Sequence, residues 1–154
     1  MQPRIFQINF SNGGVPKTGL HTAEVGPNGI VIDRHDDMVH HGGPEQNLCL
    51  YSLERIDALQ REGHPIFPGS TGENITTVGL DPELFLPGRR FRLGADIVIV
   101  TTDFAQPCKT IRDSFIDFNF NRINELKHPG WSRIYARVLE TGSITVGDSI
   151  ILLD

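Results

Sequence analysis

The stretch ADIVIVTTDFAQPCKTIR, residues 95–112, joins a buried strand to a loop cysteine and to the start of a helix. Its apolar run Ile97–Val100 is short and β-branched, which is typical of a strand that is covered on both faces. We expect this strand to end at residues 101–103, where the sequence becomes polar. Most of the other unusual residues of the chain can then be interpreted as walls around the cysteine that follows.

Cys108 stands on a stiff loop, because Pro107 fixes its own φ and restricts the residue in front of it. A thiol reacts with electrophiles and binds soft metals as the thiolate. Lys109 supplies positive charge beside Cys108, and a helix that begins at Thr110 would supply free backbone N–H groups. These residues predict a functional thiol, and a passive loop cysteine stays open as the alternative.

The composition is that of one soluble globular domain over residues 1–154, with 38% hydrophobic and 21% charged residues. A formal net charge of -5 and the lack of a basic run argue against nucleic acid binding. No apolar stretch is long enough to span a bilayer, and MQPRIFQINF does not resemble a signal peptide. We therefore expect a cytoplasmic protein. Two cysteines fit that reducing location, with Cys49 as a small buried hydrophobe.

Short β-like runs separated by glycine and proline predict a mainly β (α+β) fold, an antiparallel barrel-like sheet with a few helical insertions. Two turns predict hairpins, one around Gly26-Pro27-Asn28-Gly29 and one around Gly147-Asp148. The expected strands are residues 4–10, 22–25, 30–33, 48–51, 91–93, 97–100, 134–139, 142–146 and 149–153, with a further short strand that residues 73–76 lead into.

Two helical segments are expected between these strands. Ser52 caps the first one, Ile56 and Leu59 belong to its apolar face, and Gly63 stops it. The second segment extends over residues 110–127 as one helix or two, because its apolar residues recur near helical spacing.

Residues 33–44 contain three histidines and three aspartates, which is a composition that suits a metal site. The spacing is poor for zinc, since His40 and His41 are adjacent and no His-x-His pair occurs. The glycines after His41 indicate instead that the backbone must come close to something, and histidines beside exposed N–H groups could hold an anionic ligand. A zinc or two-metal hydrolase and a solvated loop both stay open.

The stretch PGSTGENITT, residues 68–77, is rich in glycine and hydroxyl groups and could cradle a phosphate. It is not a P-loop, because no Gly-Lys-Ser/Thr follows. Glu73 and Asn74 would serve equally well as turn and cap residues.

The stretch GWSRIYARVL, residues 130–139, predicts a strand with two different faces. Alternation places Arg133, Tyr135 and Arg137 on one face, where arginines could bind phosphate or carboxylate. An edge strand with a solvated side is the alternative.

Taken in this order, HHGGPEQNLCLYSLE, PGSTGENITTVGLD, the strand ending in QPCK, and GWSRIYARVLETGSITVGD resemble the MOSC domain, a family named for the C-terminal domain of molybdenum cofactor sulfurases. The resemblance covers nearly the whole chain, which looks like a small stand-alone member. It implies a barrel-like fold with a pocket around one functional cysteine, here Cys108. In the family that cysteine is taken to carry sulfur or to ligate the molybdenum of molybdopterin, and a soft thiolate suits either role.

The resemblance also implies which residues line the pocket and bind the phosphate and the polar edges of the cofactor. They are Lys17, His41, Gly42, Gly43, Gln46, Asn74, Thr76, Ser132 and Arg133. Many relatives are expected to have a glycine where Arg133 stands, so this arginine would narrow the pocket or add an anion contact.

Several relatives are reductases of N-hydroxylated compounds, such as hydroxylaminopurine-type bases. The resemblance therefore implies a molybdenum-cofactor-dependent oxidoreductase with Cys108 on the metal. The chain has no flavin or haem signature, and two cysteines cannot hold a Cys₄ cluster, so we expect a separate electron-donor protein. The alternative is a non-catalytic sulfur carrier or cofactor-binding module with a persulfide on Cys108.

Overall fold

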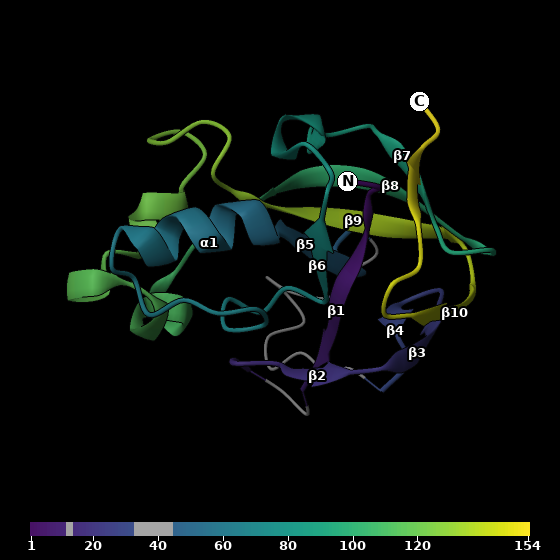
Figure 1. The fold of residues 1–154 in the computed structure, drawn as a ribbon, viewed down its shortest axis with the longest axis horizontal. Coiled ribbons are helices and arrows are strands. Elements are labelled where there is room, and N and C mark those ends of the chain that lie inside the picture. Colours follow the sequence, from purple (N-terminus) through teal and green to yellow (C-terminus); the bar gives the residue numbers. More distant parts are fainter. Residues whose placement is uncertain (12–13, 33–44) are drawn as a thin grey trace.

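The computed structural model describes residues 1–11, 14–32 and 45–154. Its described strands form an eight-stranded sheet in the order β11-β7-β8-β9-β5-β6-β1-β2 and a three-stranded sheet in the order β10-β3-β4 (Figure 1). Neighbouring strands are antiparallel, except that β5 and β6 are parallel. The strands are β1 (Arg4–Phe10), β2 (Thr18–Leu20), β3 (Thr22–Gly26), β4 (Gly29–Ile30), β5 (Leu48–Ser52), β6 (Ile75–Val78), β7 (Arg90–Leu93), β8 (Ile97–Ala105), β9 (Arg133–Glu140), β10 (Gly142–Thr145) and β11 (Ile150–Leu152).

The larger sheet curls, so that β1 lies next to the segment that precedes β11. Arg4 forms an isolated bridge with Ser149, and Ile5 N–H donates to the Asp148 carbonyl at 2.9 Å. The mainly β fold that the sequence predicts is therefore confirmed. The sheets are not closed into a barrel, however, because this contact is one bridge and a few hydrogen bonds rather than a continuous ladder.

The main apolar core takes residues from both sheets. In the central strand β9, Ile134 and Ala136 are fully buried in this core, as the alternation of the sequence predicts. Neighbouring strands add Leu50 and Ile99, and the smaller sheet adds Ile144. The opposite side chains of β9 are thereby left to face a second layer.

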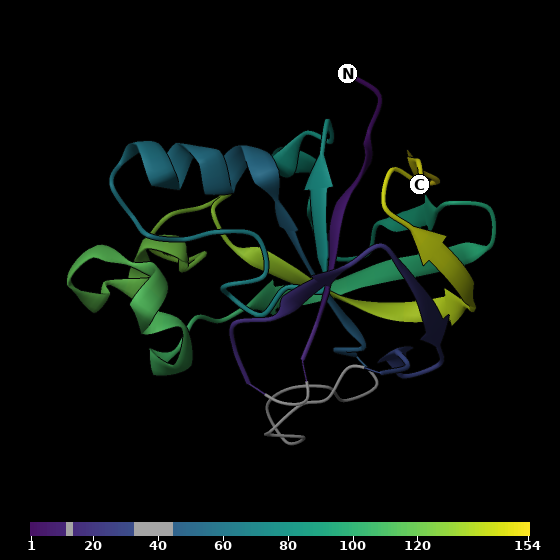
Figure 2. The same cartoon turned by 60° about the horizontal axis from the view of Figure 1, so that its bottom comes forward.

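The helices are α1 (Leu53–Arg61) and the 3₁₀ helices η1 (Pro82–Leu84), η2 (Lys109–Ser114), η3 (Ile116–Phe118) and η4 (Phe120–Ile123). Helix α1 and the segment of η2–η4 form that second layer, whereas Leu84 of η1 packs against the main core. A second apolar cluster joins β5 to these helices through Tyr51, Ile56, Leu59, Ile66, Ile111, Phe115 and Ile123. Both views place α1 and the segment of η2–η4 together at one end of the molecule, with β3, β4 and β10 at the other (Figures 1 and 2). No helix in the described part of the chain is long and apolar enough to cross a membrane.

The first expected helix is confirmed. The Ser52 hydroxyl accepts a hydrogen bond from Arg55 N–H at 3.3 Å, which caps α1. Ile56 and Leu59 are buried, and Gly63 follows the helix with a φ of +100°, a conformation that favours glycine.

The helix expected over residues 110–127 is wrong in type, since the structure has η2, η3 and η4 there. Phe115 is extended, and Asp117 and Phe118 have positive φ values of 55° and 57°, so a continuous α-helix is broken twice. Cys108 rather than Thr110 takes the N-cap position of η2. Ile111, Phe115 and Ile123 nevertheless reach one apolar cluster, as they would from one face of a helix.

Two further strand predictions need correction. Strand β8 does not end at residues 101–103 but continues to Ala105, with a register shift between Thr101 and Phe104 that accommodates the polar residues. The final hairpin is not formed, because β10 pairs with β3 and β11 pairs with β7. The hairpin of β3 and β4 is confirmed by the pairs Val25–Ile30 and Gly26–Gly29.

Candidate functional site

A second buried layer, which contains the side chains of Arg133 and Tyr135, lies on the face of β9 that points away from the main core. Tyr135 is directly opposite Cys49 of β5, and the two side chains pack with Ala105 in a small buried cluster. Arg133 pairs with Ala105, the last residue of β8. The predicted common face of Arg133 and Tyr135 is therefore confirmed. The solvated edge strand is wrong, since β9 lies between β8 and β5.

Cys108 follows this pairing by three residues. Its thiol is partly exposed, and its Sγ lies 2.8 Å from the Thr110 hydroxyl oxygen. Its side chain makes no cap bond to η2, which is a 3₁₀ helix of six residues. The short helix offers less to a thiolate than the longer helix that the sequence predicts, so the activation of this thiol stays a prediction.

The loop before β6 surrounds the carboxyl group of Glu73, which is fully buried. Gly69 N–H and the Thr71 hydroxyl donate to the two carboxyl oxygens at 2.8 Å each, and the Thr76 hydroxyl donates at 3.2 Å. Burial raises the pKa of Glu73, while the bonds from Gly69 and Thr71 and the charge of Arg133 act in the opposite direction. Glu73 thus organises the loop from within, a role that its interpretation as a turn or cap residue did not include.

This loop also connects the elements of the site. Lys17, which is buried, donates its backbone N–H to the Gly69 carbonyl at 2.9 Å. Arg133 Nη1 donates to the Thr71 carbonyl at 2.6 Å. The Ser114 hydroxyl of η2 donates to the Ser70 carbonyl at 3.5 Å. One short loop therefore brings together Lys17, Arg133 and the 3₁₀ helix that follows Cys108.

Two of the predicted pocket residues have structural partners. Asn74 Oδ1 accepts from Cys49 N–H at 2.9 Å, and Asn74 N–H donates to the Cys49 carbonyl at 2.7 Å. The Thr76 hydroxyl accepts from Asn9 Nδ2 at 3.1 Å and also donates to Glu73. These contacts hold β5, β6 and β1 in place, and a contact of either residue with a ligand stays a prediction.

Gln46 and Ser132 differ in how well their polar atoms are paired. Gln46 Oε1 is buried and has no hydrogen-bond partner among the residues that the structure describes. The Ser132 hydroxyl donates to the carbonyl oxygens of Arg133 and Ala105, at 2.7 and 3.3 Å. Within β9, Arg137 forms an ion pair with Glu45 at 3.4 Å. Gln46 therefore has an open acceptor, whereas Ser132 closes the junction of β8 and β9.

The predictions for His41, Gly42 and Gly43, and for a metal site in residues 33–44, lie outside the described residues. Across residues 1–11, 14–32 and 45–154, no three His, Cys, Asp or Glu side chains gather in a way that could hold a metal ion.

Tyr135 belongs to the site, although the sequence analysis predicted no role for it beyond its place on the strand. Burial raises its pKa to about 12, with the thiols of Cys49 and Cys108 acting in the same direction and Arg133 in the opposite one. The phenol therefore keeps its proton at neutral pH. The alternation of β9 indicated its face, but its position opposite Cys49 depends on strand pairing that the sequence does not reveal.

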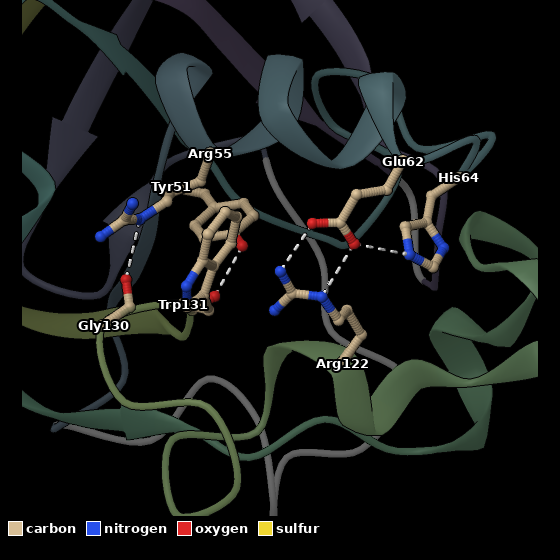
Figure 3. A network of polar contacts seen from close by, with 7 residues as sticks. All are labelled: Tyr51, Arg55, Glu62, His64, Arg122, Gly130 and Trp131. Atoms are coloured by element: carbon tan, nitrogen blue, oxygen red, sulfur yellow. Dashed lines mark hydrogen bonds and ion pairs between the residues drawn. The ribbon is translucent and has the colours of Figure 1, made fainter.

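A network around Trp131 fixes the chain where it enters β9 (Figure 3). The guanidinium carbons of Arg55 and Arg122 lie 4.4 and 4.2 Å from the Trp131 ring centre. Tyr51 donates its hydroxyl to the Trp131 carbonyl at 2.6 Å, and Arg122 donates to both carboxyl oxygens of Glu62 at 2.9 and 2.8 Å. The segment that leads into β9 is thus anchored to α1 and η4.

Comparisons with known proteins identify a matching family and relatives of similar sequence. A family model of the MOSC domain matches residues 37–151. The uncharacterized protein YflK of Bacillus subtilis (strain 168) is 31% identical over 122 residues, which are 79% of this chain and 54% of that protein. A protein named Reductase from Gibberella moniliformis (strain M3125 / FGSC 7600) is 28% identical over 131 residues, which are 82% of this chain and 23% of that protein. The chain therefore spans about half and about a quarter of these relatives.

Solved structures share the fold at lower sequence identity. YiiM from Geobacillus stearothermophilus superposes with a TM-score of 0.74 at 24% identity, covering 99% of this chain and 75% of that one. The YUAD protein from Bacillus subtilis gives a TM-score of 0.76 at 16% identity, covering 99% of this chain and 96% of that one. At these identities the likeness establishes the fold.

Proposed function

This chain belongs to the MOSC domain family, and we propose that it binds a molybdenum cofactor and reduces N-hydroxylated compounds, with Cys108 as a ligand to the metal. The observation that carries the proposal is the partly exposed thiol of Cys108, three residues after the backbone partner of the buried cation Arg133. The relative named Reductase supports the redox class. The proposed location is the cytoplasm.

The donor chemistry of the described site fits such a cofactor. A thiolate is a soft ligand that suits molybdenum, and the orphaned Arg133 Nε suits an oxyanion. Cys108 would hold the metal. The phosphate and the pterin edges would be held by Lys17, His41, Gly42, Gly43, Gln46 and Ser132, with Asn74 and Thr76 in the supporting wall. Arg133 would add an anion contact beside them.

When bound, the cofactor would supply the redox centre for reduction of N–OH to N–H, a step that consumes two electrons and two protons and releases water. The protein would position the substrate and exclude water around the thiol. Tyr135 would offer a hydrogen bond from a phenol that stays protonated at neutral pH. A separate donor protein would supply the electrons.

The test is reduction of an N-hydroxylated base by metal-loaded protein with a chemical electron donor. We expect the amine from the wild type and from Cys49→Ser, which removes the other thiol, and none from Cys108→Ser. Absence of product from wild-type protein, under conditions that activate a control molybdoenzyme, would contradict the reductase. A stable persulfide on Cys108 in that case would favour a sulfur carrier.

A further inference from the structure

The guanidinium of Arg133 is buried, and one of its nitrogens is unpaired within the described part of the chain. Arg133 is 6% exposed, and its Nη1 donates to the Thr71 carbonyl. Its Nε is shielded from solvent and has no acceptor among residues 1–11, 14–32 and 45–154. An arginine has five N–H donors, so the N–H of Nε remains available for a ligand.

No carboxylate in residues 1–11, 14–32 and 45–154 forms an ion pair with Arg133. The charge of Arg133 acts on the Glu73 carboxyl, yet the two oxygens of Glu73 already accept from Gly69, Thr71 and Thr76. A buried cation without a hydrogen-bonded counter-ion is costly, and the cost is recovered when an anion is bound.

Two other arginines of the chain show how the guanidinium edge formed by Nε and Nη2 binds a carboxylate. Arg122 binds Glu62 through Nε and Nη2, and Arg90 binds Asp154 through the same two nitrogens. In Arg133 the Thr71 carbonyl accepts from Nη1, and Nε, one of the two nitrogens of this edge, has no hydrogen-bond partner among the described residues. This edge matches a carboxylate or phosphate with two parallel hydrogen bonds.

We propose that Arg133 binds an oxyanion through the guanidinium edge that contains Nε, and that the substrate of this protein carries a carboxylate or phosphate group. The anion site stands on the geometry of Arg133 alone. The identity of its ligand as an N-hydroxylated substrate rests on the proposed function. The cofactor phosphate has the same chemistry, so the experiment must separate the two sources.

The first arm titrates cofactor-free protein with inorganic phosphate and with benzoate at constant ionic strength, and follows the melting temperature. A ligand that binds the folded state raises the melting temperature with concentration. We expect this increase in the wild type, a weaker one in Arg133→Lys, which cannot form two parallel bonds, and none in Arg133→Met. Arg137→Met is the matched control, since Arg137 lies on the same face of β9 and its Nε also lacks a hydrogen bond, but that Nε lies 3.4 Å from the carboxylate of Glu45 in an ion pair.

Either an equal increase in Arg133→Met and wild type or no increase in the wild type would overturn the anion site. Arg133→Met should fold, because a hydrophobic residue in place of an uncompensated buried charge is often neutral or stabilising.

The second arm uses loaded protein and a pair of N-hydroxylated substrates, one with a carboxylate and one neutral. We expect Arg133→Met to increase the KM of the carboxylated substrate relative to the neutral one by about tenfold or more, while Arg137→Met leaves this ratio unchanged. A reduced pterin content of Arg133→Met, with an unchanged KM ratio in the fraction that remains loaded, would assign the anion to the cofactor and overturn the anionic substrate. Anion binding without any reductase activity would instead sink the proposed function and leave the site intact.

Discussion

At the residue scale, the two cysteines differ in what surrounds their thiols. Cys49 is buried within β5, and its backbone N–H and carbonyl are both bonded to Asn74. Cys108 follows Pro107 on a loop and is partly exposed. A thiol reacts as an accessible thiolate, so the two should react at very different rates.

We predict that an aromatic disulfide reagent titrates one thiol in the native wild type and two after unfolding in denaturant. Native Cys49→Ser should still show one thiol, and native Cys108→Ser should show none within the same time. Rapid reaction of native Cys108→Ser would mean that Cys49 is accessible, and would remove the distinction on which the site depends.

Glu73 predicts a pH dependence of stability. Its pKa is raised by burial, so the folded state holds the proton more tightly than the unfolded state, whose pKa is about 4.3. The stability contributed by this group therefore falls as pH rises through the interval between the two pKa values. The slope for one proton is at most about 1.4 kcal/mol per pH unit.

Urea unfolding of wild type and Glu73→Gln from pH 4.5 upward checks this sign. The wild-type free energy of unfolding should decrease with pH relative to that of the variant, whatever the constant offset between them. Parallel curves would show that Glu73 has the same pKa in both states.

Single residues also show where sequence reasoning stops. The apolar neighbours of Cys49 and the polar neighbours of Cys108 were enough to predict which thiol is buried. The burial of Glu73 was not predictable, because it depends on Gly69, Thr71 and Thr76 folding around it.

At the scale of elements, the loop that contains Gly69 is held against the backbone of Lys17, the residue before β2. Gly69 has a φ of +89°, and a Cβ atom there would lie 2.5 Å from the Lys17 carbonyl oxygen. Gly88 has a similar φ of +86°, but nothing lies within 4 Å of its Cβ position. A comparison of Gly69 with Gly88 therefore separates the free-energy cost of backbone strain from that of the steric clash.

We predict that Gly88→Ala lowers the free energy of unfolding by about 1 kcal/mol, from strain. Gly69→Ala should cost about 1–3 kcal/mol more, because the loop must also move away from Lys17. Chemical denaturation measures both. Equal losses would mean that the close approach of Gly69 to Lys17 does not hold this loop.

The segment of η2–η4 depends on the contact of Arg122 with Trp131 and Glu62. Arg122→Ala should lower the free energy of unfolding by about 1–2 kcal/mol, from a lost ion pair and a lost cation–π contact. Because the chain has one tryptophan, its fluorescence should change as well. Arg90→Ala removes an exposed pair with Asp154 and is the control, with little expected effect. An unchanged emission in Arg122→Ala would contradict the contact.

Elements that depend on neighbouring residues were predictable, whereas those that depend on distant partners were not. Ser52 and Gly63 delimit α1, and the Gly26–Gly29 turn forms its hairpin, because these signals are local. The last two strands pair with β3 and β7 instead of with each other, and turn signals carry no information about such partners.

At the scale of the whole molecule, the curled sheet has the main apolar core on one face and a second buried layer on the other. Strand β9 contributes to both, since Ile134 lies in the main core and Arg133 and Tyr135 lie in the second layer. The helical segment after Cys108 packs on α1 and anchors the entry to β9 through Trp131. The fold therefore presents one partly exposed thiol next to a strand that carries a buried cation.

The central claim is that this arrangement binds a molybdenum cofactor through Cys108. The most direct measurement is the molybdenum and pterin content, by mass spectrometry, of protein expressed with molybdate and purified without oxygen. Wild type and Cys49→Ser should contain both, and Cys108→Ser should lack molybdenum. Wild-type protein without molybdenum, under conditions that load a control molybdoenzyme, would contradict the claim.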